Sequence, residues 1–231
     1  MQLFWSVLPL VLNLATANPT TDDGSLSSGK LPARPRAPDA PAQSVQVGRP
    51  SLMGTGCRTG TARVTLAPDN SALSALFDEF LVEVGGATRT RTAMKNCQII
   101  LPMRVPPGYQ VGIRQVQMRG FIALPEIAQA TVNLAYAFAP PMSGTRRSFE
   151  GPRVHRYAHL KGPLMDALEM HGEGRATSWS DCGENVKLVI EGRLALRTSH
   201  GLDEAQAAFD SLDAGIVLPL EWRRCRSAYS E

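Results

Sequence analysis

The chain has 231 residues, of which 43% are apolar and 19% charged, and its 24 basic and 21 acidic side chains leave a net charge of +3. The basic residues are scattered rather than gathered into a stripe, which argues against a nucleic-acid-binding protein. Length and apolar content fit one globular domain with a substantial core rather than two marginal ones.

The first 17 residues are typical of a secretory signal peptide. They contain no charged side chain, are largely apolar from Leu3 to Leu14, and end in Ala15-Thr16-Ala17, the small-x-small pattern that signal peptidase accepts. The apolar run is about twelve residues long, whereas a helix needs roughly 20 to span a bilayer, and every later run is interrupted by charged or turn residues. We therefore expect an exported, extracellular protein without a membrane span.

Residues 18–50 are predicted to be a disordered linker or pro-segment. Their composition is dominated by Pro, Ser, Thr, Ala and Asp, which cannot bury enough apolar surface to offset the entropy of ordering. The one apolar alternation, Val45 to Val47, is too brief to form a buried element by itself. Residues 51–231 are then expected to form a single domain.

Alternation with a period of two dominates this domain and indicates half-buried antiparallel strands. The turn sequence Pro68-Asp69-Asn70-Ser71 predicts a hairpin, whose return strand we expect over Leu73 to Val84. From Cys97 to Val105 every odd-numbered residue is apolar, which predicts a strand with one face in the core. Pro102 lacks a backbone donor and favours a position at a sheet edge.

The second half of the domain continues the pattern. Tyr109 to Leu124 is long enough for two strands, or for one with a bulge near Gly112, whereas Met142 to Ser180 is the least regular part and the first place to look for a site. Three later strands are expected at 130–138, 188–196 and 216–222. One short helix is expected over Leu202 to Phe209. With about seven strands, the fold class predicted is an all-β, antiparallel two-sheet sandwich with one short helix.

The four cysteines of an exported chain are expected to form two disulfides. Zinc is the rival ligand, but cysteine zinc sites usually use closely spaced pairs, and these residues lie about 40 or more positions apart. Of the three possible connectivities we expect the local one, Cys57 with Cys97 and Cys182 with Cys225, because each pair ties neighbouring strand ends together. The nested pairing, Cys57 with Cys225 and Cys97 with Cys182, stays open because domain termini often lie close together.

The histidines offer a weak metal-site hypothesis. His155 and His159 are four apart and would share a helix face, with Glu169 and His171 as further ligands. However, Arg156 stands where a zinc protease would have its glutamate, and nearby Gly-Pro pairs leave little room for a helix. An exposed loop is the favoured interpretation, and no metal or cofactor is assigned.

A second hypothesis concerns acidic residues. Asp78, Glu79 and Glu83 resemble a glycosidase carboxylate pair, because Glu79 and Glu83 would fall on one face of the expected strand. No cleft is evident, so a solvent-facing edge is favoured. The glycines of Gly54-x-Gly56-x-x-x-Gly60 do not fit the dinucleotide motif, and no G-x-S-x-G sequence is present. No catalytic residue is assigned.

Four aromatic residues lie near predicted turns, where sandwich proteins carry their binding loops: Phe121, Phe149, Tyr157 and Trp179. Any of them could face a sugar or a protein partner. For Trp179 the structural alternative is packing on the disulfide of the nearby Cys182.

Segments throughout the domain resemble a known family. They are, in order, GTGCRTGTARVTLAPDNSALSALFDEFLVEVG, KNCQIILPMRVPPGYQ, RGFIAL, FEGPRVHRY, WSDCG, DSLD and LEWRRC. Together, from about Gly54 to Cys225, they resemble the uncharacterised secreted domain-of-unknown-function family 4360 of fungi and bacteria. The most specific pieces are Asn-Cys-Gln, Trp-Ser-x-Cys-Gly and Trp-Arg-Arg-Cys, and the chain departs from the family around Pro125 to Gln129 and from His155 to His171. The resemblance implies export and disulfides but no activity, cofactor or binding residue.

These observations favour a monomeric, non-catalytic extracellular module that binds a cell-wall or other extracellular ligand, either a polysaccharide or a protein. A small secreted hydrolase is the alternative from another class, using Glu79 and Glu83 or the set His155, His159 and His171. A secreted effector that acts on another organism is the third possibility, which composition does not separate from the first.

Overall fold

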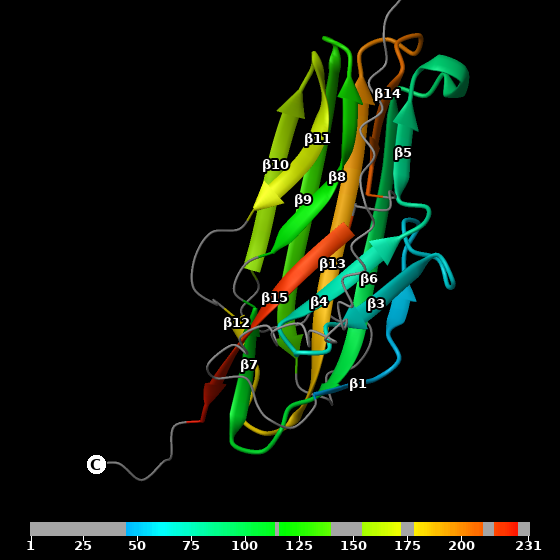
Figure 1. Cartoon of the computed structure of the whole chain (residues 1–231). Helices are drawn as coiled ribbons and strands as arrows, with labels where there is room; N and C mark the ends of the chain where they lie inside the picture. The colour runs from blue at the N-terminus through cyan, green and yellow to red at the C-terminus, as the bar shows by residue number, and fades with distance from the viewer. Residues whose placement is uncertain (1–44, 114–115, 140–153, 172–177, 210–214, 226–231) are drawn as a thin grey trace, which may run out of the picture. The chain divides into compact units, whose positions relative to one another are not determined.

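The computed structural model describes residues 45–113, 116–139, 154–171, 178–209 and 215–225. Within these residues there are fifteen strands and one 3-10 turn, η1 (Gly86–Thr88). The strands form two antiparallel sheets, which confirms the predicted two-sheet sandwich (Figure 1). The strand count is about twice the number expected.

The six-stranded sheet is built on three long strands that lie side by side. Its order is β1 (Gln46–Val47), β6 (Thr92–Arg104), β13 (Asn185–Thr198), β9 (Ala128–Ala139) and β10 (Val154–Lys161), and β2 (Ser51–Met53) pairs with β6 beyond the end of β1. Strand β10 is therefore an edge strand, and it carries several charged or polar residues, which discourages pairing with other chains.

The nine-stranded sheet is made of shorter strands. Its order is β12 (Ser178–Trp179), β7 (Tyr109–Ile113), β15 (Gly215–Arg224), β8 (Gln117–Leu124), β14 (Ala205–Ala208) and β5 (Leu81–Val84). Three more strands pair alongside this path: β11 (Leu164–His171) with β8, β4 (Ala72–Phe77) with β15, and β3 (Ala62–Leu66) with β4.

One apolar core lies between the sheets. The predicted alternation from Cys97 to Val105 is confirmed, because each odd-numbered residue there is at most 3% exposed. Even-numbered residues of β9 and β13 complete the inner face of the six-stranded sheet. Three phenylalanines pack edge to face, with ring centroids of Phe80 5.3 Å from those of both Phe77 and Phe209. Such edge-to-face pairs stabilise a core by more than the burial of their apolar surface alone.

Three expected elements are wrong in detail. The helix expected over Leu202 to Phe209 is instead strand β14, in which Ala205 and Ala207 face the core and which pairs with both β5 and β8. The return strand expected over Leu73 to Val84 is broken into β4 and β5, because Phe80 turns into the core between them and its carbonyl accepts a hydrogen bond from the Phe209 N–H at 3.0 Å. The segment 142–180, expected to be irregular, contains β10, β11 and β12.

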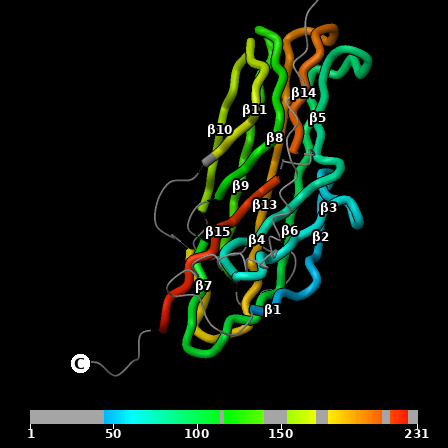
Figure 2. Tube along the Cα trace, viewed as in Figure 1, coloured from blue at the N-terminus to red at the C-terminus, as the bar shows by residue number. Residues whose placement is uncertain are grey.

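Folded structure begins before residue 51. Val45 is 6% exposed and β1 pairs with the end of β6, so the last residues of the segment expected to be a linker belong to the sheet (Figure 2). The Gly48 N–H donates to the Pro102 carbonyl at 2.8 Å, in the gap between β1 and β2. Pro102 is therefore not in an edge strand as expected, because β6 lies between β13 and the short strands β1 and β2, but it does face the gap between those two strands. Residues 1–44, including the expected signal peptide, lie outside the described residues.

All four cysteines are paired. Cys57 joins Cys97 across 40 positions, and Cys182 joins Cys225 across 43, the local connectivity that we expected. The first bridge is buried in the core. The second ties Cys182, three residues after the end of β12, to Cys225, which directly follows β15.

Candidate functional site

Four neighbouring strands, β6, β13, β9 and β10, turn polar side chains away from the core. Successive side chains of a strand point to opposite faces, so the residues between the core positions project outward. The register arranges these residues in rows that cross the strands. Two adjacent rows are Asn96, Arg193, Asn133 and Tyr157, and Gln98, Glu191, Ala135 and His155. We call these two rows the polar face.

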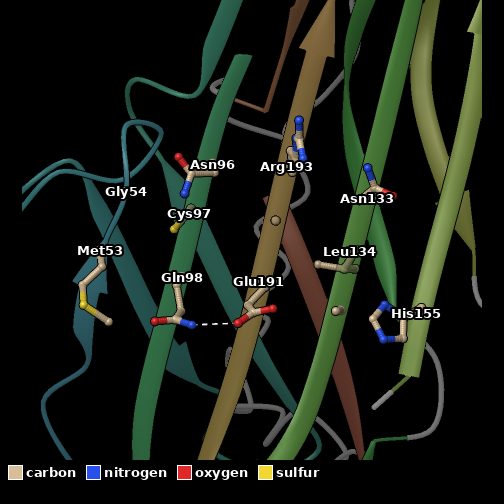
Figure 3. A pocket seen from close by; sticks show the side chains of 12 residues that line it. Met53, Gly54, Asn96, Cys97, Gln98, Asn133, Leu134, His155, Glu191 and Arg193 are labelled. Atoms are coloured by element: carbon tan, nitrogen blue, oxygen red, sulfur yellow. Dashed lines mark hydrogen bonds between the residues drawn. The ribbon is translucent and has the colours of Figure 1, made fainter. Parts of the chain in front are cut away.

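A depression of about 540 Å³ lies between the two rows (Figure 3). Ala135 has the shortest side chain of its row, which leaves the surface open between Glu191 and His155. Met53 and Gly54, at the end of β2, line the opposite side beside β6. The depression therefore crosses five of the strands of this sheet, from β2 to β10.

Residues 53–57 form the side of the depression next to β6, which we call the wall, and close backbone contacts with β6 fix its position. Gly54 has φ +126, and a Cβ there would lie 2.2 Å from the Asn96 carbonyl oxygen, so this approach requires glycine. The Gly56 N–H donates to the same oxygen at 2.8 Å, and the Asn96 N–H donates to the Thr55 hydroxyl at 3.2 Å. The Cys57–Cys97 disulfide follows directly in the chain. The wall is thus formed before any ligand binds, which lowers the entropic cost of binding.

The polar face offers planar hydrogen-bonding groups and one exposed ring. The Gln98 amide donates to a Glu191 carboxylate oxygen at 2.7 Å, which orients both groups. Arg193 is exposed and Asn133 half-buried, and neither side chain has a hydrogen-bond or ion-pair partner within the described part of the chain. Tyr157, opposite Asn133, is 64% exposed. Such a surface can hydrogen-bond to hydroxyl groups and cover an apolar ring face.

The three histidines of the metal hypothesis lie in strands rather than in a loop, and they are not brought together as a metal site. His155 and His159 both project from β10, but four strand residues separate them by about 13 Å. Glu169 and His171 belong to β11, in the nine-stranded sheet. Within the described residues no group of three or more His, Cys, Asp or Glu is placed to hold a metal ion. Of this set only His155 lines the depression.

The acidic residues do not form a catalytic pair either. The expectation that Glu79 and Glu83 share a strand face is wrong, because Glu79 lies in the bend between β4 and β5 while Glu83 is within β5. The Glu79 carbonyl accepts a hydrogen bond from the Lys95 ammonium at 2.7 Å. Asp78 forms an exposed ion pair with Arg63 at 3.7 Å. None of the three acids lines the depression.

Trp179 and its neighbours have structural roles. The Arg223 guanidinium lies 3.9 Å from the Trp179 ring centroid and so covers one face of the indole. Buried Ser180 accepts a hydrogen bond from the Val111 N–H at 3.0 Å, and the Cys182–Cys225 bridge closes the same region. The Trp-Ser-x-Cys-Gly and Trp-Arg-Arg-Cys segments therefore hold β12, β7 and β15 together.

Of the remaining aromatic candidates, Phe121 is 39% exposed on β8, in the other sheet, and Phe149 lies outside the described residues. Sequence reasoning identified Tyr157 and His155 but missed their neighbours Gln98, Asn133, Glu191 and Arg193. Each of these is an ordinary polar position in an alternating strand. Only the pairing of β6, β13, β9 and β10 brings them together.

Comparison with known proteins gives a family and a secreted relative. A family model described as domain of unknown function (DUF4360) matches residues 43–225. An "Uncharacterized secreted protein" of Arthroderma benhamiae is 27% identical over 176 residues, which cover 74% of this chain and 68% of that protein.

Among solved structures, TmCBM61 in complex with beta-1,4-galactotriose matches 76% of this chain and 88% of its own, at 7% identity and a TM-score of 0.27, a score too low to support an inference about fold or ligand. Among the described residues, no helix has the length and apolar character that a membrane crossing needs.

Proposed function

The chain belongs to the DUF4360 family, and from that premise, together with its secreted relative, we propose that it is an extracellular module that binds a glycan on the polar face. The observation that carries the proposal is Tyr157, a large ring that is 64% exposed on edge strand β10. Tyrosine is enriched in binding surfaces, where its ring offers an apolar face while polar neighbours supply hydrogen bonds.

The neighbours of Tyr157 supply the hydrogen bonds that a sugar needs. Asn133 lies directly opposite it, and Arg193 directly opposite Asn133 on the next strand. The Asn133 amide presents donors and an acceptor in one plane and the Arg193 guanidinium presents donors in another, which suits the adjacent hydroxyl groups of a pyranose. The apolar C–H face of the same sugar would lie on the tyrosine ring, so both parts of the ligand are matched within one row.

The shape of the site suits an extended chain. A row from Asn96 to Tyr157 crosses three strand spacings, about 14 Å, and the depression beside it is open rather than enclosed. Sites for small molecules usually enclose most of the ligand surface. An open, polar, strand-built groove instead favours an extended polysaccharide that lies on the outer face of the sheet.

Binding to a panel of soluble polysaccharides by affinity electrophoresis or calorimetry tests the proposal. Tyr157→Ala should weaken retention by about tenfold or more, because it removes the stacking surface, worth about 0.5–1.5 kcal/mol beyond its buried area. Phe121→Ala is the matched control, since it removes an exposed ring from the other sheet and should leave binding unchanged. Binding that is insensitive to Tyr157, or lost equally in both variants, contradicts the proposal.

A further inference from the structure

The outward face of β6, β13, β9 and β10 is electrostatically one-sided. Its basic side chains are Arg104, Lys161, Lys187, Arg193 and Arg197. Glu191 is the one carboxylate that the described residues place on this face, and it is bonded to Gln98. The chain as a whole has nearly equal numbers of basic and acidic residues, so this asymmetry comes from the way the strands are paired and not from composition.

Three of these basic residues lie either in the row of Tyr157 or two rows from it. Arg193 stands in the row of Tyr157, and Arg197 and Lys161 stand on either side of Gln129 in a row two steps further along. Four residues along a strand separate these rows by about 13 Å. The Arg197 guanidinium donates to the Gln129 side-chain oxygen at 3.2 Å, which directs it across β9 toward Lys161. Between the two cationic rows lie Thr131 and His159, without a carboxylate among the described residues.

We propose that the glycan bound on this face is acidic, a polysaccharide that carries carboxylate groups at intervals along its chain. This inference rests on the proposed function and adds its ligand class. A guanidinium binds a carboxylate through two parallel hydrogen bonds, and Arg193 has no partner within the described part of the chain that would compete for them. One uronic acid unit would bind Arg193, in the row of Tyr157, and a later acidic unit further along the strands would reach Arg197 and Lys161.

Polygalacturonate and its fully methyl-esterified form make a suitable pair of probes, because they share a backbone and differ in charge. The protein should bind the acidic form at least about tenfold more tightly at low salt, and added salt should reduce this preference by screening. Arg193→Gln should lower the affinity for polygalacturonate about tenfold while changing that for the ester little. Glu191→Gln, which keeps an oxygen acceptor for Gln98, should raise the affinity for polygalacturonate, because it removes the opposing charge.

Arg63→Gln is the matched control. Arg63 is 70% exposed on β3, in the nine-stranded sheet, so its substitution makes the same change in net charge away from the site and should leave binding unchanged. Equal affinity for the two polymers, or an equal effect of Arg63→Gln and Arg193→Gln, overturns the acidic ligand but leaves the glycan proposal standing. Polygalacturonate binding that survives Tyr157→Ala shows general attraction of a polyanion and also overturns it. Binding of neither polymer nor of the neutral panel removes the proposed function itself.

Discussion

Ser180 is the buried polar residue on which the junction of β12 with β7 depends. Ser180 is only 2% exposed. Its hydroxyl accepts a hydrogen bond from the Val111 N–H at 3.0 Å and donates one to the Asp181 carbonyl at 3.0 Å. Val111 itself is fully buried. Ser180→Ala would leave the Val111 N–H without a partner and without access to water.

The expected cost follows from that arrangement. An unsatisfied buried donor costs about 1–3 kcal/mol, whereas an average hydrogen bond contributes only about 1 kcal/mol net. A loss of about 2 kcal/mol lowers the Tm of a domain of this size by about 4–8 °C. The Cys182–Cys225 bridge lies just beyond and keeps the segment in place, so the donor cannot find water by local unfolding of the strand.

Thermal unfolding followed by circular dichroism measures this change. Ser51→Ala is the control, because Ser51 is exposed on β2 and its substitution should stay within about 0.5 kcal/mol. A Tm for Ser180→Ala within a degree of the wild-type value would refute the reasoning, since it would mean that Val111 has another partner or that the site admits water.

Two further substitutions test the wall of the depression. Gly54→Ala should destabilise the protein more than Gly60→Ala, because both glycines have positive φ but only at Gly54 does a Cβ meet backbone, 2.2 Å from the Asn96 oxygen; equal Tm losses would contradict this steric argument. Replacing Cys57 and Cys97 together by alanine should cost about 4 kcal/mol in urea unfolding, from the entropy of a 40-residue loop, and should weaken glycan binding by releasing the wall. Unchanged binding in that folded variant would show that the wall does not contribute to the site.

Strand positions were predictable wherever alternation was regular, because the period-two pattern directly reports which side chains face the core. Cys97 to Val105 is the clearest case, and the local pairing of the cysteines followed from the same placement of strand ends. Where the pattern was short or irregular, tertiary contacts prevailed. The alanines of β14 have high helix propensity, yet the strand pairs between β5 and β8, where Ala205 and Ala207 are fully buried.

The proposed glycan site shows the same division between sequence and structure. By itself the sequence determined that the domain is a disulfide-bonded two-sheet sandwich, and it identified Tyr157 as a candidate binding residue and His155 as a candidate metal ligand. It carries no signal that Asn96, Asn133 and Arg193 are neighbours, because they lie on three strands far apart in the chain and each is an unremarkable polar position. Register decides which polar residues share a row, and a shift of one residue would turn Arg193 into the core. The site therefore exists only once the buried faces of β6, β13 and β9 have aligned these strands.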